Sequence, residues 1–163
     1  MTDFRGLLTA LAREGVEFII VGGAAATAHG SARLTLDLDV VYGRTRENLS
    51  RLVRSLGLVK PYPRGAPPGL PFRWDERTLR AGLNFTLTTT LGDLDLLGEI
   101  AGGGTYDDLL PHSVTLSIYD LSCRVLGLDA LIRAKHAAGR PKDFESLAEL
   151  EVIREERRKE NRR

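Results

Sequence analysis

Cysteine and long apolar runs are both scarce in this chain of 163 residues. The single cysteine, Cys123, excludes an internal disulfide framework and a cysteine-rich zinc site. No run approaches about 18 consecutive apolar residues, so we expect no segment that spans a membrane. The first residues also lack the basic region, apolar stretch and cleavage site of a signal peptide, which predicts a cytoplasmic protein.

An excess of charge of one sign is missing as well. Lysine and arginine number 23 against 22 acidic residues, a formal charge of +1 that points to no class of partner. The hydrophobic share of 42% and the charged share of 28% are ordinary for a folded domain and exclude a disordered chain. At about 150 residues per domain, the length predicts one structural unit.

Helical and strand patterns alternate along the chain. Apolar spacing predicts helices near residues 4–14, 24–29, 45–56, 129–138 and 142–163, and strands near residues 16–21, 35–42, 84–90, 94–97, 113–119 and 122–126. Gly92-Asp93 is expected at the turn of an antiparallel hairpin between the third and fourth of these strands. Helices interleaved with strands that include a hairpin predict an α/β fold with a mixed sheet. Five of the seven prolines fall within residues 61–71, which predicts a long surface loop ending near Trp74.

Two adjoining motifs carry the chemistry. Gly22-Gly23 follows an apolar strand and opens an alanine-rich helix, and Asp37-Leu38-Asp39 lies on the next strand. Residues i and i+2 of a strand share a face roughly 6.5–7 Å apart, so Asp37 and Asp39 present two carboxylates side by side. Their repulsion is removed by a divalent cation, and Mg²⁺ prefers such oxygen ligands together with substrate phosphates. The glycines let a ligand approach the backbone, and amides at a helix start attract anions.

A third carboxylate follows on another predicted strand. Asp95 stands among leucines, where an unpaired charge is costly, whereas Asp93 is expected in the turn. Three carboxylates would let two metals sit about 3.5–4 Å apart, the arrangement for phosphoryl displacement. Each feature also has an ordinary interpretation, because an Asp-x-Asp pair is often a solvent-facing edge and a glycine pair is often only a turn.

The order of these motifs resembles the nucleotidyltransferase superfamily, which has the polymerase-beta-like fold. The run VGGAAATAHGSARLTLDLDV is most similar to the bacterial AbiEii-type and related nucleotidyltransferase proteins, many of them toxins of toxin–antitoxin pairs. The later runs GDLDLLGEI and LIRAKHAAGRPKDFESLAEL resemble that group's third-carboxylate strand and its C-terminal helices. The likeness covers most of the chain and is weakest over residues 44–82.

The resemblance implies a nucleotidyltransferase fold, with a catalytic domain at residues 1–126 and C-terminal helices at 127–163 packed on it as one unit. By this resemblance Asp37 and Asp39 would hold Mg²⁺, Asp95 would be the third carboxylate and the general base, Gly22 and Gly23 would cradle the phosphates of an NTP, and Arg33 and Lys135 would meet phosphate or nucleotide. From the residues alone, the alternatives to a phosphate contact are that Arg33 is an ordinary surface arginine and that Lys135 is an ordinary solvated lysine.

The implied activity is Mg²⁺-dependent transfer of a nucleoside monophosphate from an NTP to an acceptor hydroxyl. The acceptor that we expect first is RNA, such as the 3′ end of a tRNA. The protein would then act as a toxin and have a cognate antitoxin protein as partner. The alternatives are an aminoglycoside- or lincosamide-type antibiotic nucleotidyltransferase and a catalytically inactive nucleotide-binding module. Residues 154–163 hold six basic and three acidic side chains, which fit a solvated helix end or a handle for RNA or an acidic partner.

Overall fold

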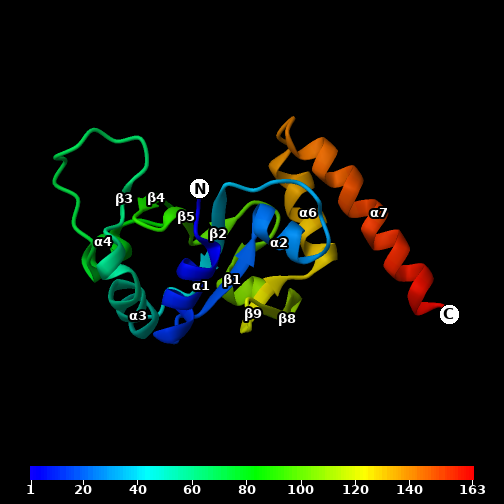
Figure 1. Cartoon of the computed structure of the whole chain (residues 1–163), viewed down its shortest axis with the longest axis horizontal. Coiled ribbons are helices and arrows are strands. Elements are labelled where there is room, and N and C mark those ends of the chain that lie inside the picture. Colours follow the sequence, from blue (N-terminus) through cyan, green and yellow to red (C-terminus); the bar gives the residue numbers. More distant parts are fainter.

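A computed structural model describes residues 1–163 and contains one large mixed sheet (Figure 1). Its seven strands lie in the order β3-β4-β5-β2-β1-β9-β8. The strands are β1 (Phe18–Val21), β2 (Asp37–Tyr42), β3 (Tyr62–Pro63), β4 (Phe85–Thr89), β5 (Gly92–Leu97), β8 (Ser113–Ile118) and β9 (Leu121–Leu126). β2 is parallel to β5 and β1 is parallel to β9, whereas the other neighbours are antiparallel. The short strands β6 (Glu99–Ile100) and β7 (Gly104–Thr105) pair separately.

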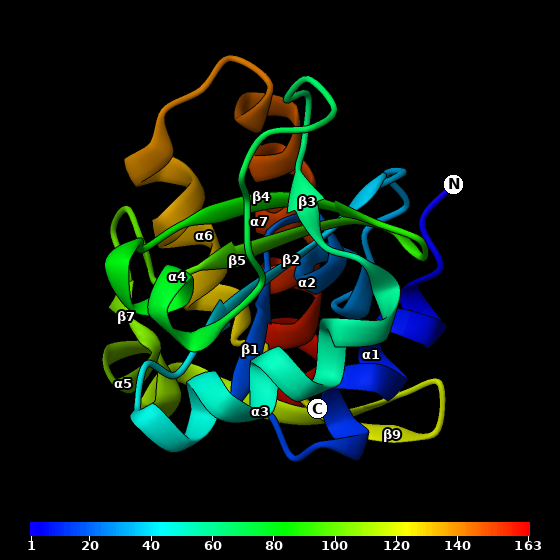
Figure 2. The same ribbon diagram turned by 90° about the vertical axis from the view of Figure 1, so that its left-hand side faces the viewer.

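Seven α-helices pack around the sheet. They are α1 (Phe4–Arg13), α2 (Gly22–Ala28), α3 (Arg46–Leu56), α4 (Glu76–Ala81), α5 (Tyr106–Leu109), α6 (Leu128–Ala138) and α7 (Asp143–Asn161), with short 3₁₀ turns at Gly57–Val59 and Leu110–His112. Figure 2 shows α1 and α3 in contact beside the strands, and α4 packs on α3. α6 packs on both α2 and α7, at the opposite end of the molecule from α3 and α4 (Figure 1). This arrangement confirms the mixed α/β fold, and none of its helices combines the length and apolarity needed to cross a bilayer.

Local signals in the sequence account for most element boundaries. The Thr45 side chain accepts a hydrogen bond from the Asn48 amide and so caps α3, whose apolar stripe of Leu49, Leu52 and Leu56 is buried. In β2 and β5 the alternate residues Leu38 and Leu94 are fully buried, which turns the intervening aspartates to the other face of the sheet.

The structure corrects two expectations. The hairpin turn is formed by Thr90 and Leu91, and β5 already begins at Gly92, so Asp93 is a strand residue and not a turn residue. The region expected to be one loop holds a short strand, because Tyr62–Pro63 pairs with β4. The helix α4, just beyond that region, is not predicted from the sequence. Asp75 caps α4 by accepting a hydrogen bond from the Thr78 amide.

Candidate active site

The register of β2 against β5 gathers four carboxylates on one face of the sheet. In this parallel pair Asp37 lies opposite Asp93, and Asp39 lies opposite Asp95. Because residues two apart share a face, all four side chains point to the same side. The acidic cluster, meaning these four aspartates, is therefore a product of both the two Asp-Leu-Asp motifs and their pairing.

Three members of the acidic cluster approach closely enough to share a cation. Asp37, Asp39 and Asp95 each offer a carboxylate oxygen, and these oxygens lie within 4.8 Å of one another. All three residues are half-buried. Hard oxygen donors at this spacing are the ligands that divalent cations such as Mg²⁺ prefer. The structure thus brings together the three carboxylates that the sequence singles out.

The surroundings of Asp39 disfavour its charged form. Burial, followed by the charges of Asp95 and Asp37, raises its pKa to about 7, and the nearby Arg64 offsets only part of this rise. Its Oδ1 atom is buried and has no hydrogen-bond partner. A buried carboxylate oxygen without a partner is costly, and a metal ion is one group that would satisfy it.

The cation that does contact the acidic cluster is Arg64, which follows β3. Its guanidinium lies 2.8 Å from Asp95 Oδ1, 3.5 Å from Asp93 Oδ1 and 3.6 Å from Asp37 Oδ2. No sequence motif points to Arg64, because it lies in the proline-rich segment that is expected to be a surface loop. The two Asp-Leu-Asp motifs contain no lysine or arginine. This lack is the one signal in the sequence that a cation from elsewhere in the chain would have to balance the aspartates.

The glycine pair has a structural role inside the site. Gly22 has φ +61°, and a Cβ built on it would collide with the Asp39 carboxylate. A Cβ on Gly23 would come within 2.6 Å of the Thr35 hydroxyl, which donates a hydrogen bond to the Asp37 carbonyl. The space that these glycines leave is thus occupied by side chains of the protein itself. Their contact with phosphate remains a prediction.

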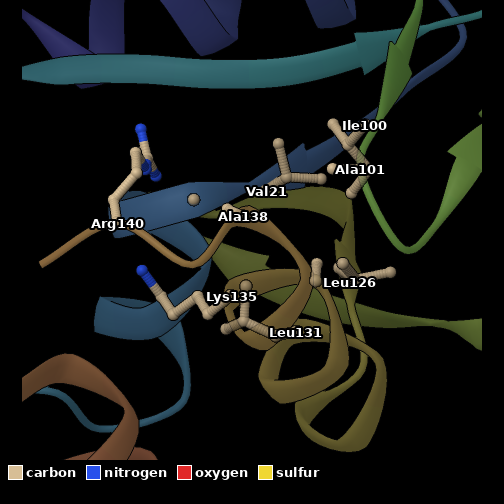
Figure 3. A pocket seen from close by; sticks show the side chains of 10 residues that line it. Val21, Ile100, Ala101, Leu126, Leu131, Lys135, Ala138 and Arg140 are labelled. Carbon is tan, nitrogen blue, oxygen red and sulfur yellow. The ribbon is translucent and has the colours of Figure 1, made fainter. Parts of the chain in front are cut away.

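A cavity of about 260 Å³ adjoins Gly22. It is lined by residues of α6 together with the ends of β1 and β9 and the β6 region. Figure 3 shows the nitrogen atoms of Lys135 and Arg140 at one side of it, and the side chains of Ile100, Ala101 and Leu126 at the other. The cavity therefore has a cationic end and an apolar end.

Lys135 is not the solvated lysine that was one of the two possibilities. Its side chain is 11% exposed, and its ammonium lies 3.7 Å from Asp143 Oδ1. Burial lowers the pKa of Lys135, while the charges of Asp143 and of Asp39 act in the opposite direction. Arg140 donates two hydrogen bonds to the same buried Asp143, at 2.8 and 3.3 Å. Burial works against the charged form of Asp143, but these cations outweigh it and lower its pKa.

Arg33 is placed differently from Lys135. Its guanidinium pairs with Glu145 of α7 at 3.1 Å, and it lines a second, largely apolar cavity with residues such as Ala24 and Thr35. It is not among the residues that line the cavity at Gly22. The contact of Arg33 with phosphate stays a prediction.

Comparisons with known proteins bear on the fold. No family model and no curated protein matches the chain. Among solved structures, it is similar to a protein of Thermotoga maritima described as a "putative nucleotidyltransferase", with a TM-score of 0.50 and 15% sequence identity. The likeness covers 98% of this chain and 91% of that one. The chain therefore has the fold of that structure along almost its whole length, whereas the resemblance to the AbiEii-type proteins stays a prediction.

Proposed function

We propose that this protein is a Mg²⁺-dependent nucleotidyltransferase that uses an NTP. The observation that carries the proposal is the convergence of Asp37, Asp39 and Asp95 within 4.8 Å beside a cavity with a cationic end. The likeness over 98% of the chain to a structure described as that of a "putative nucleotidyltransferase" supports the same conclusion. Neither the fold nor the acids alone would carry it, because one fold hosts many functions.

The residues present fit a divalent metal. Three carboxylates supply oxygen donors, and the unpartnered Oδ1 of Asp39 supplies an unmet need for a cation. Bound metal would stabilise negative charge on the transferring phosphoryl group and lower the pKa of the attacking hydroxyl. We assign the holding of the ions to Asp37, Asp39 and Asp95.

The chain's own residues would divide the remaining work. The cationic end formed by Lys135 and Arg140 would bind the triphosphate, and the apolar end near Leu126 would receive the base. Gly22 and Gly23 would lie along the phosphates, with Arg33 as a further phosphate contact. Asp95 would take the proton of the acceptor hydroxyl. The oxygen of that hydroxyl would then bond to the α-phosphorus as the bond from phosphorus to pyrophosphate breaks.

One observation favours a second candidate, a non-catalytic module. Arg64 contacts three of the four aspartates, so the acidic cluster is partly neutralised without any metal. A purely structural ion-pair network would look the same in this respect. It would not explain why Asp39 Oδ1 is left without a partner, which is why we place the enzyme first.

For the acceptor we put RNA first, with action as the toxin of a toxin–antitoxin pair. The support is the resemblance of the sequence and a groove between α6, α7 and β8 that is lined by four arginines, Arg133, Arg154, Arg157 and Arg158. Such a basic surface suits a phosphate backbone. A toxin role predicts growth arrest on expression, relieved by Asp39→Asn, and implies an antitoxin protein as partner.

The direct test is incubation with α-labelled NTPs and total RNA, with and without Mg²⁺. We expect label in RNA only with Mg²⁺, and its loss in Asp39→Asn. Asp120→Asn is the matched control, because it makes the same change at an exposed turn between β8 and β9. Transfer that persists in Asp39→Asn or without divalent metal would contradict the proposal.

A further inference from the structure

Arg64 reaches the acidic cluster from a strand that is not adjacent to it. Its backbone N–H donates to the Thr86 carbonyl of β4 at 2.9 Å, so it continues the pairing of β3. Its side chain then extends over β4, donates to the Leu87 carbonyl at 2.8 Å and ends among the carboxylates. Hydrogen bonds to β4 thus hold both the backbone and the guanidinium of Arg64.

The positions of the charges make Arg64 the principal counter-charge of the cluster. Its side chain is 27% exposed, so its ion pairs are partly shielded from water. Lys135, whose charge also interacts with that of Asp39, pairs with Asp143. The Nε–H of Arg64 is buried and makes no hydrogen bond, so even this guanidinium is not optimally satisfied. Four carboxylates and one guanidinium leave the cluster net negative.

Arg64 and a divalent ion need the same ligands. Two of the three carboxylates that converge, Asp37 and Asp95, are the ones that Arg64 contacts. Asp39, the third, has no ion pair with it. A metal that binds Asp37 and Asp95 brings a second cation to carboxylates that Arg64 already contacts, so repulsion between the two cations weakens these ion pairs.

We propose that Arg64 is the resident cation of the acidic cluster and competes with divalent metal ions for Asp37 and Asp95. The inference rests on the proposed metal site. In the metal-free chain Arg64 holds these carboxylates in place. Metal binding then costs the free energy of the ion pairs that it breaks. Because the guanidinium is carried by a side chain, it can withdraw without moving β4 or β5.

The test is Mn²⁺ binding to the full chain, measured from the electron paramagnetic resonance signal of free Mn²⁺ in the absence of nucleotide. Charge-assisted hydrogen bonds contribute enough that their loss should change affinity about tenfold. We expect Arg64→Gln to bind Mn²⁺ about tenfold more tightly than the wild type. Arg64→Lys keeps the charge but cannot contact three carboxylates, so it should fall between them.

Arg54→Gln is the matched control, because Arg54 pairs with Glu14 and with no member of the acidic cluster, so this change should leave Mn²⁺ affinity unchanged. Equal affinity of wild type, Arg64→Gln and Arg64→Lys would overturn the competition and leave the metal site standing. If no variant binds Mn²⁺, both the competition and the metal site are wrong. Should Arg64→Gln fail to fold by near-ultraviolet circular dichroism, Arg64→Lys decides: tighter binding supports the competition and equal binding contradicts it.

Discussion

Asp39 couples the stability of the metal-free protein to pH. Its pKa is raised to about 7 in the folded chain, chiefly by burial, whereas the pKa of an aspartate in an unfolded chain is about 4. Between these values the folded state holds the proton more tightly. Stability attributable to Asp39 therefore falls as pH rises from about 4 to about 7, and the penalty persists above that range.

Asp39→Asn should remove this penalty while retaining the shape of the side chain. At pH 8, in the presence of a chelator, we expect the variant to be more stable than the wild type by about 1–2 kcal/mol. The advantage should shrink as the pH is lowered toward about 4. Urea unfolding at several pH values measures it, and a variant that is less stable than the wild type at pH 8 would contradict this account of Asp39.

Gly22 is a residue at which one methyl group should disturb the site. Its φ of +61° disfavours other residues, and a Cβ would meet the Asp39 carboxylate. We expect Gly22→Ala to lower stability by about 1–2 kcal/mol and to weaken Mn²⁺ binding. Gly57→Ala is the control, because φ is −57° there and an added Cβ meets nothing within 4 Å. Equal behaviour of the two variants in urea unfolding and Mn²⁺ titration would show that the space beside Asp39 is unimportant.

At the scale of elements, sequence reasoning succeeds where a signal is local. Thr45 and the leucines after it predict α3, and the alternation of Asp37 with Leu38 predicts a strand with one acidic face. The Asp75 cap before α4 was a local signal too, although the prolines before it suggested only a loop. Element boundaries therefore follow from nearby residues, even at α4, which the sequence analysis does not predict.

Pairing between elements lies beyond such signals. That β2 runs parallel to β5 with Asp39 opposite Asp95 depends on packing of the whole sheet, and the misplaced turn hid the contribution of Asp93. Arg64 enters the site only because β3 pairs with the far side of β4. Three of the expected site residues thus follow from motif spacing, whereas their counter-charge follows from topology.

The helix α6 carries a prediction of its own. Lys135 lines the cavity at Gly22 from this helix, and Asp143 retains Arg140 if the lysine is lost. Lys135→Met should therefore weaken NTP binding about tenfold, since a charge-assisted contact to phosphate is removed. Lys142→Met, at an exposed position near the start of α7, is the matched control. Calorimetric titration with each NTP and Mg²⁺ measures both, and unchanged affinity in Lys135→Met would remove this residue from the proposed nucleotide site.

At the scale of the whole molecule, the candidate site draws on segments that are far apart in the sequence. Lys135 of α6 and Arg140, which follows α6, line the cavity at Gly22, and the segment after β3 brings Arg64 to the carboxylates of β2 and β5. β3 and α6 lie at opposite ends of the molecule (Figure 1). Residues separated by more than a hundred positions, Gly22 and Lys135, thus line one cavity. The likeness over 98% of the chain to another solved structure indicates that this arrangement is that of a known fold.

The central claim, that the acidic cluster is a divalent-metal site for a nucleotide, is tested most directly by crystallography with Mn²⁺ and a non-hydrolysable NTP. The account predicts an anomalous difference peak contacted by Asp37, Asp39 and Asp95, with the triphosphate extending toward Lys135 and Arg140. It also predicts that the Arg64 guanidinium is displaced from Asp95. A map with no peak at these carboxylates, and with Arg64 still bound to Asp95, would contradict it.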